Sequence, residues 1–364
     1  MSSHSRTKGR GFTLIELLVG IVVGLLTVLA ITESFALFEG RKRTSIGGAT
    51  AEENGLLGGF MIERDARMAG FGLGNIGCTT IKAYNANVSP TDFTLSGLSV
   101  TITQNTVSTQ YPATATPGTD TIEIVYSTSA FGSIPAILQM PMPDSSAILR
   151  VDNGIGFVEG QLVLISQPPL DCTVVQASQN GQQIGIANLT GPGTQWNLQH
   201  NPGGTFPFNP PGGHNIFPAG GYTTGAKVHN MGSMVHRRYY ISNNNLMVDE
   251  MTTVGAAAGN YVTQTLVNGI VSLKAQYGRD TGTDGYIDTF DNTAPASSDK
   301  LVALRFGLLA RSGVYEKDVV TGSTTISLWP SGPTATITAD EQHYRYKPFY
   351  TTVPLRNTIW NNNP

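Results

Sequence analysis

The strongest pattern along the chain is an apolar run near its N-terminus. Positions 12–31 hold 20 residues with a single charge, Glu16. A helix of this length spans the roughly 30 Å core of a bilayer. Residues 1–10 carry Arg6, Lys8 and Arg10 and no acidic residue, which is typical of a cytoplasmic flank. The pattern predicts a membrane-spanning helix over 12–32, with the rest of the chain outside the cytoplasm.

The helical pattern continues beyond the membrane through residues 33–70. Apolar residues recur among charged ones as a weak amphipathic stripe, which paired glycines at 47–48 and 58–59 loosen. A helix from residue 12 to 69 would measure about 85 Å, with Gly70 as its C-terminal cap. The continuation argues against the alternative of a removable secretory signal cut after Ser34-Phe35-Ala36. We expect a stalk whose far half lies against a globular head.

From residue 71 to 364 the pattern changes to that of a β-rich head. Short runs rich in Thr, Val and Ile alternate with turn residues over 92–175, as in antiparallel strands. Residues 234–251 predict a hairpin that turns at 243–245. The stretch 201–221 is too rich in Pro and Gly for a regular element. Its aromatic residues either form a contact patch or pack onto the head: Phe206, Phe208 and Phe217.

These elements define an α+β fold, a long apolar helix with a large antiparallel head that is long enough for two subdomains. With 40% hydrophobic and 13% charged residues, the 364-residue chain can bury a sizeable core. A net charge of −3 gives no electrostatic case for binding nucleic acid. The two cysteines, Cys78 and Cys172, lie on the oxidising side of the membrane in this topology. We therefore expect a disulfide between them.

The sequence shows no catalytic constellation. The six histidines form neither an HExxH motif nor a pair with metal-binding spacing, and no G-x-S-x-G elbow or P-loop is present. Residues 72–77 satisfy G-x-G-x-x-G, but the motif follows a helical segment instead of a strand, so we interpret it as a loop. We expect a protein that is not an enzyme and requires no cofactor.

One acidic loop, residues 280–291, is comparable to an EF-hand loop. It has acids at loop positions 1, 5, 9 and 12 and a glycine at position 6. Position 3 is Gly282 and flanking helices are not evident. The alternative is therefore an Asp-Gly hairpin turn with solvated acids. The hypothesis is a weak Ca²⁺ site whose ligands are the Tyr286 carbonyl and the carboxylates of Asp280, Asp284, Asp288 and Asp291.

The start of the apolar run, Gly11-Phe12-Thr13-Leu14-Ile15-Glu16 after a basic leader, resembles the class III signal of type IV prepilins and pseudopilins. The resemblance implies that a prepilin peptidase cuts between Gly11 and Phe12, removes the leader 1–11 and methylates the Phe12 amine. Residues 12–32 then remain as a membrane anchor and later form part of a filament core. Glu16 would pair with the Phe12 amine of an adjacent subunit, because a buried amine needs a compensating charge. Glu16 snorkelling at the membrane edge is the alternative, which does not explain its fixed distance from Phe12.

Two further stretches narrow the resemblance. Residues 63–72, with Cys78 after them, resemble the RDxRMAGY…GC stretch of the PilW family of minor pilins. Residues 350–357 resemble that family's closing TTVxLRN segment, and 304–312 its preceding strand. Position 33 is Glu, where major pilins of the type IVa kind usually have a proline, which argues against a major pilin.

The PilW resemblance implies a minor pilin that primes or assists type IV pilus assembly at or near the tip. The implied partners are the prepilin peptidase, other minor pilins, the major pilin and a PilY1-type tip adhesin. The implied location is the inner membrane, with a periplasmic head, and after assembly the pilus at the cell surface. The alternatives are a type II secretion pseudopilin and a membrane-anchored calcium-binding adhesive module that does not polymerise.

Overall fold

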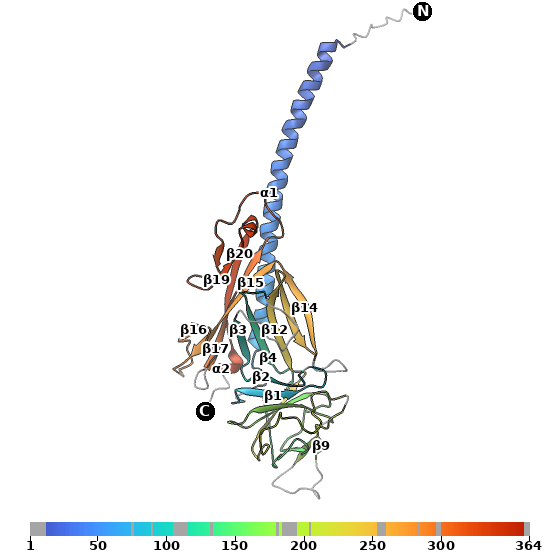
Figure 1. Ribbon diagram of the computed structural model, residues 1–364, viewed down its shortest axis with the longest axis vertical. Coiled ribbons are helices and arrows are strands. Elements are labelled where there is room, and N and C mark those ends of the chain that lie inside the picture. Colours follow the sequence, from blue (N-terminus) through green and yellow to red (C-terminus); the bar gives the residue numbers. More distant parts are fainter. Residues whose placement is uncertain are drawn as a thin grey trace, which may run out of the picture.

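A single long helix projects from a β-rich head in the computed structural model (Figure 1). The structure describes residues 12–73, 76–88, 90–104, 116–131, 134–179, 182–183, 195–203, 205–252, 260–282, 284–295 and 300–359. The predicted fold class is confirmed, since an apolar helix near the N-terminus is followed by a large, mainly antiparallel head.

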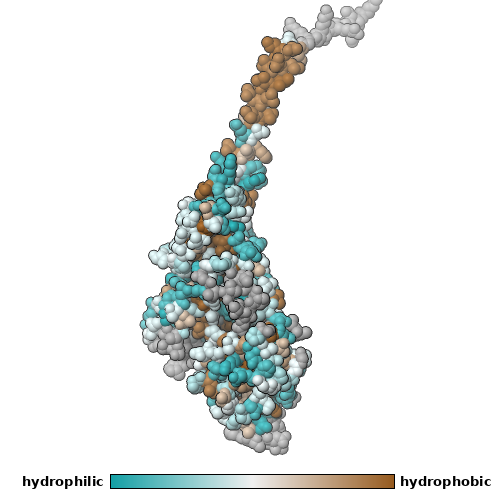
Figure 2. All heavy atoms as spheres, viewed as in Figure 1, coloured by the Kyte–Doolittle hydropathy of each residue, from teal (hydrophilic) through white to brown (hydrophobic). Residues whose placement is uncertain are grey.

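Helix α1 (Leu14–Met68) contains 55 residues and measures about 83 Å. Its first half carries exposed apolar side chains and stands clear of the head, as the brown upper end of Figure 2 shows. Its second half lies against the head (Figure 1). The helix ends at Met68, with Ala69 as its C-cap, and Gly70 follows with a left-handed φ of 78°. The Gly70 N–H donates to the Val125 carbonyl at 3.0 Å, which joins the end of the helix to the head.

The face of α1 that meets the head consists mainly of small residues. Its buried positions are Gly47, Ala51, Gly55, Gly58, Ile62, Asp65 and Ala66. A Cβ on Gly55 would lie 2.1 Å from the Phe349 ring, so only glycine permits this approach. One glycine of each pair, Gly47 and Gly58, is buried against the head, so these glycines also allow close packing, which the sequence pattern did not indicate.

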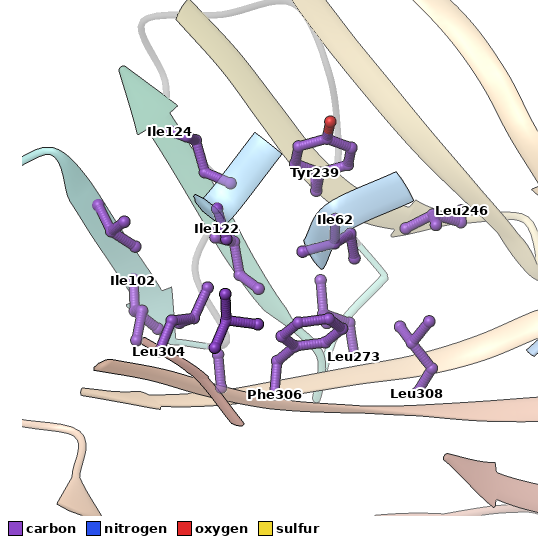
Figure 3. Close-up of a cluster of buried hydrophobic side chains, with 14 of the residues drawn as sticks. Ile62, Ile102, Ile122, Ile124, Tyr239, Leu246, Leu273, Leu304, Phe306 and Leu308 are labelled. Atoms are coloured by element: carbon purple, nitrogen blue, oxygen red, sulfur yellow. The ribbon is translucent and has the colours of Figure 1, made fainter. Parts of the chain in front are cut away.

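Two sheets flank this half of α1. One has the order β14-β13-β12-β4-β3 and the other β16-β15-β17-β20. Figure 3 shows their shared core, in which Ile62 of α1 lies among side chains from both sheets, including Ile122 and Phe306. The bounds are β3 (Val100–Gln104), β4 (Asp120–Tyr126), β12 (Val235–Ser242), β13 (Asn245–Met251), β14 (Tyr261–Asn268), β15 (Ile270–Asp280), β16 (Thr289–Asp291), β17 (Lys300–Arg311) and β20 (Tyr346–Pro354).

A second group of strands lies at the end of the head farthest from the apolar half of α1 (Figure 1). Its six-stranded sheet has the order β2-β1-β8-β7-β11-β5, and β1 and β8 are parallel. The bounds are β1 (Thr80–Tyr84), β2 (Asp92–Ser96), β5 (Ala136–Ile137), β6 (Leu149–Val151), β7 (Leu162–Ser166), β8 (Cys172–Gln176), β9 (Gln182–Gln183), β10 (Trp196–Leu198) and β11 (Lys227–Gly232). We call these strands the distal sheets. The remaining elements are β18 (Thr325–Ser327), β19 (Thr334–Thr336), the 3₁₀ helix η2 (Asp340–His343) and α2 (Arg356–Ile359).

Local expectations within the head are also met. Strands β12 and β13 form the predicted hairpin, and Asn243 and Asn244 take left-handed φ values of 51° and 60° in its turn. Of the phenylalanines in the Pro- and Gly-rich stretch, Phe208 and Phe217 are buried, so they pack onto the head and form no exposed contact patch.

Candidate functional site

The N-terminal end of α1 presents a capped, acidic start to an apolar helix. The Thr13 backbone N–H and side-chain hydroxyl each donate to Glu16 Oε2 at 2.9 Å, and the Glu16 N–H donates to Thr13 Oγ1 at 3.3 Å. This capping box satisfies donors at the start of the helix that have no partner within it. Phe12 is 88% exposed. The predicted cleavage residue Gly11 lies outside the described residues.

The apolar side chains that follow Glu16 have no counterpart in the head to cover them. Large hydrophobic residues from Leu14 to Ile31 are all at least half exposed. By length and composition α1 is the one described helix suited to crossing a membrane. Such a continuous apolar surface needs either lipid or other helices around it.

The junction between α1 and the head centres on Asp65, which is 1% exposed. Asp65 Oδ2 accepts hydrogen bonds from Arg237 Nη1 at 2.7 Å and from the Tyr239 hydroxyl. Both partners lie on β12, and Arg237 also pairs with Glu250 on β13 at 2.9 Å. Burial, reinforced by the Asp65 charge, raises the pKa of Tyr239, so this tyrosine stays a proton donor. The group ties the stalk to one sheet.

The chain's closing segment holds the other side of the same helix end. Strand β20 pairs with β17, and the chain then enters α2. Asn357 Nδ2 donates to the carbonyls of Met68 and Ala69, both at 3.2 Å. The last carbonyls of a helix lack partners within it, so Asn357 caps α1 from a position far along the chain.

A disulfide joins Cys78 to Cys172 across a sequence separation of 94 residues, with the Cα atoms 5.9 Å apart. Cys78 follows the turn after α1, and Cys172 begins β8. The bond therefore links the end of the stalk to the distal sheets.

The acidic loop 280–291 connects β15 to β16. Its carboxylates mainly accept hydrogen bonds from the loop itself. Asp288 Oδ2 accepts from the Thr281 and Gly282 N–H groups at 2.7 and 2.9 Å, and Asp284 Oδ1 from the Tyr286 N–H at 2.9 Å. Asp291 forms an ion pair with Arg279. Within the described residues, no three His, Cys, Asp or Glu side chains are grouped to hold a metal ion.

Comparison with known families matches both ends of the chain. Residues 6–32 match the family described as the prokaryotic N-terminal methylation motif, and residues 238–357 match type IV pilus-assembly protein W. The two matches support a type IV prepilin-like protein of the PilW family. No curated protein and no solved structure matches it significantly.

The two family matches bear on the role of the N-terminal helix. The methylation motif implies processing by a prepilin peptidase, and the pilus context implies other pilins as partners. The apolar half of α1 suits a membrane-anchored protein. The family is a structural component of pilus assembly.

The contacts that join the end of α1 to the head were not predicted from the sequence. Asp65 and Asn357 lie in stretches that resemble the PilW family, and Arg237 lies in the predicted hairpin, but nothing local indicates that the three residues meet. The one available signal was Asp65 itself, an acid on the helix face otherwise made of small and apolar residues. Such an acid is expected to have a partner when buried.

Proposed function

We propose that this protein is a minor pilin of a type IV pilus that primes or assists assembly and lies at or near the tip. The leader 1–11 is removed, Phe12 is N-methylated, and the apolar half of α1 then leaves the membrane to pack among the helices of other pilins. The head faces the periplasm before assembly and the cell surface afterwards.

The observation that carries this proposal is the exposed helix of residues 14–31 with a single acid, Glu16, near its start. A permanent anchor needs the apolar surface but not the acid. In a helix bundle, Glu16 can exchange its Thr13 hydrogen bonds for the buried amine of a neighbour, which fixes the register between subunits.

The size of the head supports a place at the end of the fibre. The distal sheets extend the head away from the stalk (Figure 1). In the middle of a fibre, each subunit is followed by another one along the axis. A terminal subunit has neighbours on one side only, so the distal sheets would find room there.

Replacing Glu16 by Ala tests the assembly role. The variant should remain in the membrane fraction and should be lost from sheared pili, because its neighbour's amine would have no partner. Glu33→Ala is the matched control, since Glu33 is an exposed acid on the same helix beyond the apolar run. Normal incorporation of the Glu16→Ala variant into pili would refute the proposal.

Two other functions compete with this one. A type II secretion pseudopilin would share the processing but would be missing from surface pili in immunogold images. A non-polymerising adhesive module would stay in the membrane with or without Glu16. We favour the pilus because the family match over 238–357 is to a pilus-assembly protein.

A further inference from the structure

The acidic loop between β15 and β16 contains one carboxylate oxygen that the protein leaves unsatisfied. Asp280 is fully buried at the end of β15. Its Oδ2 accepts from the Gly285 N–H at 2.8 Å, whereas its Oδ1 is buried and has no hydrogen-bond partner. A buried carboxyl oxygen without a hydrogen-bond partner is strongly unfavourable. Asp280 Oδ1 is therefore available to bind a ligand that is not part of the chain, such as a cation.

The unsatisfied oxygen borders the same space as an oxygen of a second carboxylate. A Cβ built on Gly282 would lie 4.0 Å from Asp280 Oδ1 and 3.6 Å from Asp288 Oδ2, so both oxygens border the space at Gly282. Asp288 Oδ2 also accepts hydrogen bonds from the Thr281 and Gly282 N–H groups, which hold it at this position. Asp284 is exposed on the same loop, so its side chain has room to turn toward the Asp280 and Asp288 oxygens.

We propose that this loop binds a Ca²⁺ ion through Asp280 Oδ1, with Asp284, Asp288 and loop carbonyls completing the ligand set. All these ligands are oxygens, and the loop contains no His or Cys, which favours a hard cation over zinc. Ca²⁺ accepts six to eight oxygens in irregular geometry, whereas Mg²⁺ requires a near-ideal octahedron. The three carboxylates are not grouped around a point without the ion, so binding would draw Asp284 inward.

The structure removes one residue from the EF-hand scheme. Asp291, the acid at loop position 12, pairs with Arg279 through Nη2 at 2.5 Å and Nε at 3.3 Å. Arg279 thereby neutralises the carboxylate that would close an EF-hand loop. Asp291 is consequently the matched control for Asp280, since both are acids of the same loop but only Asp280 has an unsatisfied oxygen.

Thermal unfolding of the full chain in detergent tests the site. After treatment with EDTA, the melting temperature should rise on addition of roughly millimolar Ca²⁺. Asp280→Asn and Asp284→Asn should abolish the rise, and Asp291→Asn should retain it. Asp284 is exposed, so its variant remains informative if Asp280→Asn does not fold. No rise in the parent, or a rise that survives both substitutions, would overturn the proposal.

A substitution that should raise the affinity for Ca²⁺ provides a second, independent test. Gly282→Asp restores the acid of loop position 3, and the neighbours of its Cβ lie at ordinary contact distances. The Ca²⁺ concentration for a half-maximal rise should fall by about tenfold, because affinity follows the charge of the ligand set. An unchanged concentration would count against the site. The inference does not depend on pilus assembly, because the readout is melting temperature alone.

Discussion

Asp65 of α1 and Arg237 of β12 form an ion pair at 2.7 Å across the boundary between stalk and head. The Asp65 side chain is buried, and the Arg237 side chain is 20% exposed. Most of the buried face of α1 consists of small or apolar residues whose contacts are not directional. The ion pair and the Tyr239 hydrogen bond therefore fix the axial position of α1 relative to the sheet.

Removing Asp65 should loosen the junction. The Asp65→Ala variant leaves the Tyr239 hydroxyl and part of the Arg237 guanidinium buried without an acceptor. We expect the free energy of unfolding to fall by about 3 kcal/mol, measured by denaturant titration in detergent. Arg67→Gln is the control, because its exposed pair with Glu63 contributes less than about 0.5 kcal/mol. Equal stability of the two variants would show that Asp65 does not stabilise the contact between α1 and the head.

Two glycines four residues apart on α1 should respond oppositely to the same substitution. Gly55→Ala forces a methyl group into the Phe349 ring and should destabilise the protein by about 1–3 kcal/mol. Gly59→Ala meets nothing within 4 Å and should stabilise the helix by up to about 1 kcal/mol. Melting temperatures of both variants, compared with the parent, measure the difference. If both substitutions stabilised the protein, the result would contradict the close approach of Gly55 to Phe349.

The glycines show where sequence reasoning reached its limit. The long helix and the β12–β13 hairpin could be predicted because their signals are local, an apolar run and a turn of asparagines. A glycine in a helix lowers propensity and also permits close approach, and only the residue opposite decides which effect matters. For Gly55 that residue is Phe349, at the far end of the chain.

The candidate site divides in the same way. Glu16 could be singled out because a charge in an apolar run is conspicuous, and its distance from Phe12 is a motif. Arg237 lies 172 residues from Asp65. Its strand contains charged residues of the kind found on solvent-exposed strand faces, so the local sequence does not single it out. The pair depends on how α1 docks, which no local pattern encodes.

The disulfide should be a large part of the stability of the head. In the chain-entropy model, a loop closed across 94 residues contributes about 4–5 kcal/mol. Addition of a reducing agent should therefore shift the urea midpoint of the parent to lower concentration. The chain has only two cysteines, so Cys78→Ser/Cys172→Ser should show the lower midpoint with or without reductant. An unchanged midpoint in the reduced parent would contradict this account.

His229 should make stability depend on pH. Its Nε2 lies 3.2 Å from Ser166 Oγ in the distal sheets, and its Nδ1 has no partner. Burial, together with the nearby Lys227 charge, lowers the pKa of His229 to about 4. An unfolded histidine has a pKa of about 6.5. Between these two values the unfolded state binds the extra proton, so stability is complete above pH 6.5 and falls as the pH falls toward 4.

The His229 contribution can be isolated by comparing variants. From pH 7 to pH 5 this group should lower the free energy of unfolding by about 2 kcal/mol. His229→Gln, which cannot be protonated, should flatten the pH dependence by that amount. A parent and a His229→Gln variant with equal slopes would show that His229 is not held neutral.

The central claim is that Phe12 becomes the first residue of the working protein. The most direct measurement is the mass of the N-terminal peptide of the protein recovered from its native cell. The account predicts a chain that begins at N-methylated Phe12. A chain that begins after Ala36, or one that retains Met1, would contradict it, since the first is a secreted protein and the second a permanent membrane anchor.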